Sequence, residues 1–169
     1  MKYIYFLFLS VLMMSCIKEH FSDESLTFYK TDYIGNKLKI DGYYLKKDET
    51  ENYYYSFIFY CNGIAINLIV DSTLDDYIKS LHNSVMYQIK SYWGLYLIKN
   101  DTILTEHYQD EWIQGMKTYL KTGIIINDTT FIIKEEKRAI NGSELKVLND
   151  TFHFRKFSPK PDSTNQYIL

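Results

Sequence analysis

Cysteine and proline are scarce in this sequence of 169 residues. The two cysteines, Cys16 and Cys61, are far apart, which excludes a disulfide framework of several bridges and a zinc site built from Cys-x-x-Cys pairs. The two prolines, Pro159 and Pro161, both lie near the C-terminus, so no proline interrupts strand pairing in the rest of the chain. The sequence is therefore free to form a continuous sheet without covalent cross-links.

Glycine-rich loops, basic stripes and paired histidines are also missing. The seven glycines are scattered through expected turns, so no phosphate-binding loop is present. The 19 basic and 21 acidic side chains give a net charge of -2, which does not indicate a nucleic-acid partner. The histidines are too far apart in sequence for the paired spacing of a zinc helix: His20, His82, His107 and His153. We expect no metal and no cofactor.

The N-terminus has the layout of a secretory signal. Lys2 is followed by an apolar run from Tyr3 to Met14 and by the small residue Ser15, directly before Cys16. A permanent membrane span needs about 20 apolar residues, and this run is too short. The sequence therefore predicts a signal peptide at 1–15, removed during export.

The string Leu12-Met13-Met14-Ser15-Cys16 resembles the lipobox of bacterial lipoprotein signals, although Met13 departs from the usual Leu, Val or Ile. The resemblance implies cleavage before Cys16 and lipid on that cysteine, with several acyl chains giving a firm hold on a membrane. Ile17 after the cysteine is similar to outer-membrane sorting signals of diderm bacteria, and Lys18-Glu19 resembles the export tag of Bacteroidota surface lipoproteins. We expect a cell-envelope protein anchored in the outer membrane, on a side that these residues leave open.

The mature chain divides into a polar tether at 16–25, a single β-rich domain at 26–157 and an irregular C-terminal tail at 158–169. With 17 Tyr and 10 Phe, the composition favours sheet. Once Cys16 carries lipid, Cys61 has no disulfide partner, and we expect it to be a small buried hydrophobe. Alternating apolar residues predict strands at 26–31, 37–46, 53–60, 64–70, 92–98, 102–112, 116–126, 129–136, 144–148 and 151–157.

Turn residues separate these strands. The segment Cys61-Asn62-Gly63 predicts a hairpin with a type I′ turn. Asn100-Asp101-Thr102, Asn127-Asp128-Thr129 and Asn149-Asp150-Thr151 each follow an apolar stretch and predict three similar turns. Further turns are expected at Gly35-Asn36 and Asn141-Gly142.

One helix is expected, over residues 73–90. Ser72 is a suitable cap, Asp75 and Asp76 complement the helix dipole, and the apolar residues that follow form one stripe. The neighbouring strands at 53–60 and 64–70 are apolar on both faces, which indicates a sheet covered on its second face, by this helix or by another layer.

The expected fold is all-β: an antiparallel meander closed into a barrel or folded into a two-layer sandwich, lipocalin-like, with the amphipathic helix packed on it. The turn pattern and the strand start at Trp93-Gly94 also resemble those of small uncharacterised lipoproteins of Bacteroidota. That resemblance spans most of the mature chain, rests on turn motifs alone and implies no activity.

Two kinds of non-enzymatic function fit this fold. A barrel interior rich in aromatic rings is suited to an apolar small molecule. The candidate lining is Tyr53, Tyr55, Phe57, Phe59, Trp93 and Tyr96. The alternative is that these rings only fill the core. A scaffold that docks on an envelope protein complex through an exposed sheet edge is the second possibility.

An enzyme is less favoured. The best candidate is a hydrolase-like envelope enzyme in which His107 pairs with a nearby carboxylate: Glu106, Asp110 or Glu111. On a strand, however, Glu106 points to the face opposite His107. His153 and Arg155 share a face expected to meet solvent, and the charge runs at 48–51 and 134–138 are typical of solvated surface. We therefore predict no catalytic residue.

Four Asp-Ser or Asp-Thr pairs resemble the acceptor motif for O-glycans on exported Bacteroidota proteins. Each lies at an expected turn, where a glycan has room, although Asp-Thr is also ordinary turn chemistry. The candidate acceptors are Ser72, Thr102, Thr129 and Ser163.

Overall fold

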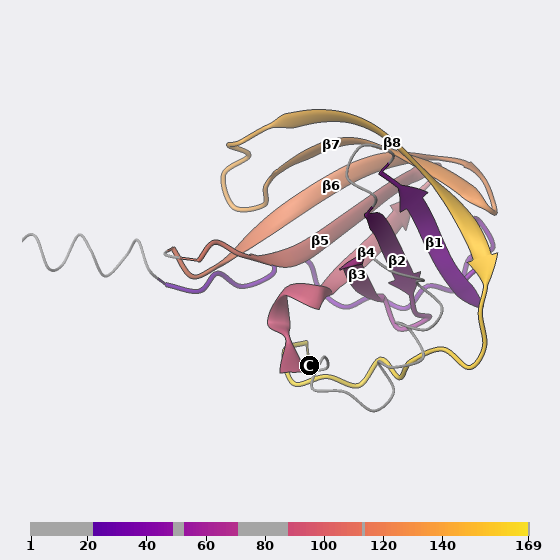
Figure 1. Ribbon diagram of the computed structural model, residues 1–169, viewed down its shortest axis with the longest axis horizontal. Helices are drawn as coiled ribbons and strands as arrows, with labels where there is room; N and C mark the ends of the chain where they lie inside the picture. Colours follow the sequence, from indigo (N-terminus) through magenta and orange to yellow (C-terminus); the bar gives the residue numbers. More distant parts are fainter. Residues whose placement is uncertain (1–21, 49–52, 71–87, 113, 169) are drawn as a thin grey trace, which may run out of the picture.

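The chain folds into a closed, eight-stranded antiparallel β-barrel (Figure 1). The computed structural model describes residues 22–48, 53–70, 88–112 and 114–168. The strands are β1 (Gly42–Lys47), β2 (Tyr54–Phe59), β3 (Ile64–Val70), β4 (Trp93–Lys99), β5 (Thr102–Asp110), β6 (Met116–Asn127), β7 (Thr130–Arg138) and β8 (Lys146–Lys156).

Each strand pairs with the next one in sequence, and β8 returns to pair with β1, where Tyr44 lies opposite Phe154. The meander predicted from the turn pattern is therefore confirmed, and it closes as a barrel of lipocalin-like topology rather than as a sandwich. Every described strand pairs with a neighbour on both sides over at least part of its length, and the shortest pairing, between β3 and β4, covers only Ile64 to Ile66 of β3.

Three strand predictions were wrong in whole or in part. The strand predicted at 37–46 begins only at Gly42, because the Leu38 and Lys39 N–H groups donate to the Tyr33 hydroxyl and the Asp128 carbonyl instead of to a paired strand. Residues 26–31 form no strand; instead the main-chain N–H groups of Thr27 and Phe28 donate to the carboxylate of Glu106 at 2.7–2.9 Å. The segments 144–148 and 151–157 belong to one strand, β8, and the predicted turn at 149–151 lies within it, with Asp150 opposite Ile133. Continuous pairing with β7 outweighs the local turn preference of Asn149-Asp150.

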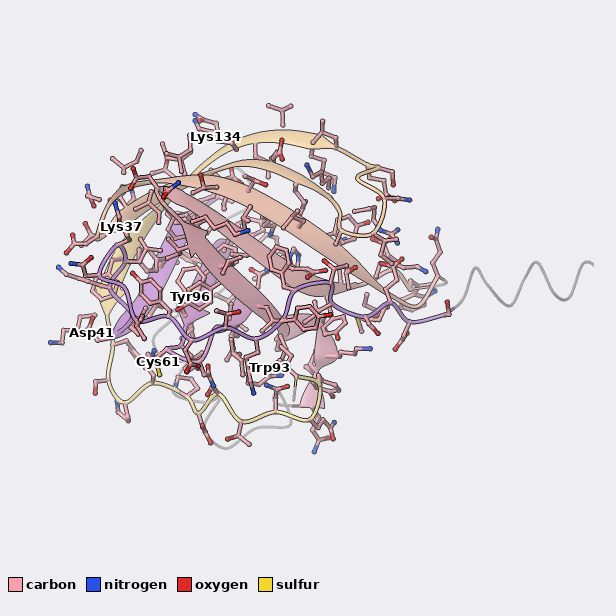
Figure 2. The ribbon with its side chains drawn as sticks, turned by 180° about the vertical axis from the view of Figure 1, so that it is seen from behind. Lys37, Asp41, Cys61, Trp93, Tyr96 and Lys134 are labelled. Atoms are coloured by element: carbon pink, nitrogen blue, oxygen red, sulfur yellow. The ribbon has the colours of Figure 1, made fainter. Side chains whose placement is uncertain are left out.

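The turns at 100–102, 127–129 and 141–142 lie where the sequence placed them, whereas the predicted turn at Gly35-Asn36 joins no two strands and the loop at 61–63 differs in type. At Cys61-Asn62-Gly63 only Gly63 has a positive φ, of 79°, and its N–H donates to the Tyr60 carbonyl. The loop is therefore a three-residue hairpin with a left-handed glycine, and the type I′ prediction was wrong. A Cβ at position 63 would lie 2.3 Å from the Thr31 carbonyl oxygen, so glycine also lets the N-terminal segment pack here. Cys61 is exposed, not buried as expected, because it lies in this turn (Figure 2).

Apolar side chains pack on both faces of the barrel wall. Inside, rings from opposite strands meet: Phe57 of β2 lies 5.1 Å from Phe152 of β8, between ring centroids. Outside, a second cluster covers β1 to β4, with Trp93 and Leu68 buried in it. The outer layer is supplied in part by the chain ends: Leu26, Phe28, Phe157, Tyr167 and Ile168.

This second layer explains why the sequences of β2 and β3 are apolar on both faces, as expected for a covered sheet. Figure 1 shows the C-terminal tail passing below the barrel to end beside η2 (Lys90–Tyr92), a single 3-10 turn. Most of the predicted helix at 73–90 lies outside the described residues. Its C-terminal limit was wrong, since Ile89 is extended, with φ of -92° and ψ of 104°. Within the described ranges there is no α-helix, and hence none of the length and apolarity that a bilayer crossing requires.

Candidate ligand site in the barrel

The barrel interior has two halves of opposite character. One half is packed with aromatic rings. Phe57 and Phe59 stack with centroids 5.6 Å apart, Phe131 and Phe152 stack at 5.1 Å, and the ring of Tyr44 lies 5.0 Å from Phe131. The Tyr44 hydroxyl donates to the Asp128 carbonyl at 2.8 Å, and burial raises its pKa well above the usual value. This half is a solid core of the kind that stabilises small domains.

The other half is lined by polar and charged side chains. The inward positions of β5, β6 and β7 carry His107, Lys121 and Glu136, and the neighbouring strands add Lys46 and Asp150. Lys121 Nζ lies 3.4 Å from Glu136 Oε1, and Lys46 Nζ lies 2.6 Å from Asp150 Oδ1. Each of these two pairs joins one positive and one negative charge and is neutral overall.

A hollow of about 560 Å³ opens onto this polar half. It exists because β3 and β4 pair only from Ile64 to Ile66, so the wall separates beyond that point, and η2 lies at the rim. A smaller hollow of about 270 Å³ shares four lining residues with it: Tyr55, Asn67, Lys121 and Glu136. The rest of the larger hollow is lined by Ile69, Ser91, Tyr92, His107, Tyr108, Gln109 and Asp110.

His107 is the most informative side chain in the hollow. It is 5% exposed, and its Nδ1 atom has no hydrogen-bond partner among the described residues. Burial, together with the charge of Lys121, lowers the pKa of His107 well below its usual value, and the main chain of Tyr119 opposes this shift only in part. The ring is therefore neutral at physiological pH. A buried polar atom without a partner costs about 1–3 kcal/mol, so the unpartnered Nδ1 atom calls for an explanation.

The Lys121 side chain is also largely buried. Burial lowers the pKa of its ammonium group, while the adjacent Glu136 favours the charged form. The side chains of this pair are 16% and 11% exposed, and the half-exposed Lys146 reaches Glu136 Oε2 at 3.7 Å. A charged pair of this kind can exchange its mutual contact for contacts to a ligand that enters the hollow.

The predicted lining residues are distributed over three places. Tyr55 lies on the wall of the polar hollow. Phe57, Phe59 and Tyr96 lie in the packed aromatic half, and the Tyr96 hydroxyl donates to the Tyr60 carbonyl at 2.8 Å (Figure 2). Tyr53 precedes β2 and is partly exposed, and Trp93 lies on the outer face, 1% exposed.

Sequence reasoning missed Lys121, Glu136 and Asp150 as members of the site. Lys121 was detectable, because it alternates in phase with Tyr119 and Gly123 on the inward face of β6. Glu136 was not: a bulge between Ile133 and Glu135 shifts the phase of β7 by one residue. The expectation that the charge run at 134–138 is solvated was therefore wrong for Glu136, which is buried.

The candidate catalytic group does not assemble. Glu106 lies on the face opposite His107, as strand alternation predicts, and binds the N-terminal segment instead. The carboxylate of Glu136 is 3.8 Å from His107 Nε2, beyond hydrogen-bond distance. His153 is exposed, as predicted. Across the described ranges, no three His, Cys, Asp or Glu side chains are placed to hold a metal ion.

The modification candidates remain predictions. Cys16 and Ser72 lie outside the described residues. Thr102 begins β5, Thr129 Oγ1 hydrogen-bonds with Asn127, and Ser163 accepts a hydrogen bond from Asn62, all in partly exposed positions.

No known protein family, curated protein or solved structure matches the chain. Its class is thus defined by its own fold: an eight-stranded antiparallel meander barrel with a buried aromatic cluster at one end and a charged hollow at the other.

Proposed function

We propose that this protein is a lipid-anchored cell-envelope protein whose barrel binds a small polar molecule in the charged hollow. The observation that carries the proposal is the placement of His107, which is buried, neutral and without a partner for Nδ1, on the wall of that hollow. A hydrogen bond between this atom and a ligand hydroxyl or amide would offset the cost of leaving it unpartnered.

The chemistry of the interior favours a polar ligand over the apolar one that the aromatic content suggested. The apolar half is occupied by stacked rings, whereas the open half offers charged pairs and the amides of Asn67 and Gln109. An apolar molecule in this half would remove the remaining solvent from Lys121 and Glu136 and offer them no hydrogen bond in exchange, which opposes its binding.

The ligand class we favour is neutral and rich in hydroxyl groups, such as a short saccharide. The charges of Lys46 and Lys121 are balanced by those of Asp150 and Glu136, and Asp110 adds one negative charge at the rim, so the lining does not favour an anion. Carboxylates accept hydrogen bonds from hydroxyl groups, and amides both donate to them and accept from them. Tyrosine rings present flat faces to C–H groups. Three such rings line the hollow: Tyr55, Tyr92 and Tyr108.

The anchor and the address rest on the N-terminal sequence. The signal-like run before Cys16 supports export, lipidation and residence in the outer membrane. The scaffold alternative in its sheet-edge form is weaker, because all eight described strands are paired on both sides. A catalytic role has less support still, because His107 lacks a hydrogen-bonded carboxylate.

Isothermal titration calorimetry on the detergent-purified, anchored protein tests the ligand class. The panel holds neutral mono- and disaccharides, amino acids and fatty acids. We expect a saccharide to bind, and Lys121→Met to weaken that binding at least tenfold, a loss of about 1.4 kcal/mol.

Lys156→Met is the matched control, because this lysine is well exposed on β8, far from the hollow, and pairs only loosely with Asp41 at 3.7 Å. Preferred binding of fatty acids, or equal binding by wild type and Lys121→Met, contradicts the proposal.

A further inference from the structure

Large apolar side chains are exposed at one end of the barrel. Trp112, in the turn between β5 and β6, is 92% exposed. Ile140, Leu145 and Val147, in and beside the turn between β7 and β8, are each more than half exposed. Figure 1 shows both turns projecting from the same end, and the Ala139 N–H donates to the Thr118 carbonyl at 2.9 Å, which joins the second turn to β6. We call these four residues the tip cluster.

The N-terminal segment joins the barrel at this same end. The Glu24 N–H donates to the Met116 carbonyl at 2.8 Å, and Asp23 Oδ1 accepts from the Met116 N–H at 2.9 Å. The Glu24 carboxylate also accepts from the Thr118 N–H and forms an ion pair with Arg138. Residues 23 and 24 are therefore held beside the first residue of β6, four positions after Trp112.

The length of chain before this point limits where the lipid can be. Cys16 and Ser22 are six positions apart, a span of at most about 20 Å when fully extended. A strand of 12 residues such as β6 is about 40 Å long. The end of the barrel that carries the tip cluster thus stays close to a bilayer that holds Cys16, while the opposite end extends away from it.

We propose that the tip cluster rests on the lipid bilayer, with Trp112 at the level of the headgroups. This inference depends on the anchor at Cys16 but not on the ligand. Tryptophan favours this depth because its ring is apolar and its N–H reaches water and headgroup oxygens. Tethering raises the effective concentration of the tip cluster at the bilayer, so a contact too weak to recruit the free barrel is made by the anchored one.

The contact is apolar rather than electrostatic. The charged side chains near Trp112 are of both signs. The Asp110 carboxylate accepts from the Trp112 N–H at 3.0 Å, Glu111 immediately precedes Trp112, and Asp23 is paired with Lys90 at 3.1 Å. Basic side chains described at this end, such as Lys117 and Arg138, are paired with the Glu24 carboxylate and do not form an unpaired cluster that would attract anionic lipids. A zwitterionic surface is therefore sufficient, and salt has little effect.

Tryptophan fluorescence tests the contact directly, because the other tryptophan, Trp93, is 1% exposed and contributes a constant signal. The native anchored protein is placed in phosphatidylcholine vesicles and compared with mature Cys16→Ser protein free in solution. We expect quenching of Trp112 by aqueous iodide to fall at least threefold in vesicles, and spin-labelled lipids to quench it. Trp112→Phe removes both effects.

Leu145→Ser is expected to restore part of the iodide quenching, whereas Ile126→Ser, an equally exposed isoleucine at the turn between β6 and β7 on the opposite end, is the control and changes nothing. Equal quenching of Trp112 in the anchored and free proteins overturns the inference and leaves the anchor intact. Shielding that requires another envelope protein overturns it in favour of a protein partner. An intact mass without lipid overturns both the inference and the anchor, and leaves the ligand site unaffected.

Discussion

The pair formed by Lys121 and Glu136 separates a binding role from a structural one. Changing Glu136 to Gln leaves a largely buried ammonium group without its anion, since the two side chains are only 16% and 11% exposed. Breaking a buried pair in this way costs about 3–5 kcal/mol, and we expect about 3 because solvent reaches the hollow. The half-exposed Lys146 contributes less than about 1 kcal/mol to this figure.

The double change Lys121→Met with Glu136→Leu is expected to behave differently. Two apolar side chains of similar volume need no desolvation of charge, so the free energy of unfolding should return to within about 1 kcal/mol of wild type. The single changes Lys121→Met and Glu136→Leu each leave one charge without its partner and are expected to cost about 3 kcal/mol each, or about 6 kcal/mol together, which makes the coupling between the two sites large. The double variant should keep the fold and lose the ligand.

Urea unfolding at pH 7 measures these differences, with the buried Trp93 as the fluorescent reporter and Lys156→Met as the control. The slope of the transition must stay constant for the comparison to hold. If the double variant is as unstable as the sum of the single variants, the two side chains do not interact. If it is stable and still binds the ligand, the hollow is not the binding site.

Three further changes probe the core, the histidine and the hairpin. Phe131→Ala removes a fully buried ring that contacts four other rings and should cost about 3–5 kcal/mol in urea unfolding. The pKa of His107 is lowered in the folded state, so below pH 6.5 the unfolded chain binds a proton that the native chain does not. The free energy of unfolding should therefore fall with decreasing pH by about 1.4 kcal/mol per pH unit more in wild type than in His107→Gln, as measured by urea unfolding from pH 7 to pH 5. Gly63→Ala should lower the melting temperature, since a Cβ there meets the Thr31 carbonyl at 2.3 Å and the backbone is left-handed.

Much of the fold was predictable because its signals are local. At Asn127-Asp128 and Asn141-Gly142 a side chain bonds to the nearby backbone: Asn127 Oδ1 accepts from the Thr129 N–H at 2.9 Å and Asn141 Oδ1 from the Ser143 N–H at 3.0 Å. At Asn100-Asp101 the turn uses the tolerance of asparagine for a left-handed backbone, with φ of 56° at Asn100. The two-sided apolar pattern of β2 and β3 likewise indicated a covered wall. These properties depend on residues near in sequence.

The site was less predictable because its determinants are long-range. The same Asn-Asp-Thr signature forms no turn at 149–151, where β7 lies alongside and supplies hydrogen bonds to the strand. Glu136, the β7 carboxylate that lies 3.8 Å from His107, is 29 positions away in sequence and faces the histidine only because of the bulge before Glu135. The closure of the barrel and the gap between β3 and β4 depend on the register of all eight strands.

The two ends of the barrel interior have separable tasks. The stacked rings stabilise the fold through burial and packing. This offsets the free-energy cost of keeping charged side chains and the unpartnered Nδ1 atom of His107 in the other half. The charged residues do not add to the stability of the fold, because apolar residues would fill the same space more stably.

The polar half is also the half that adjoins the tip cluster. Asp110 lines the hollow and, through its carboxylate, accepts the N–H of Trp112 at 3.0 Å. The rim of the hollow and the residue that we place at the bilayer are thus joined by one hydrogen bond. If Trp112 rests on the bilayer as we propose, Asp110 and the rim of the hollow that it lines lie near the membrane.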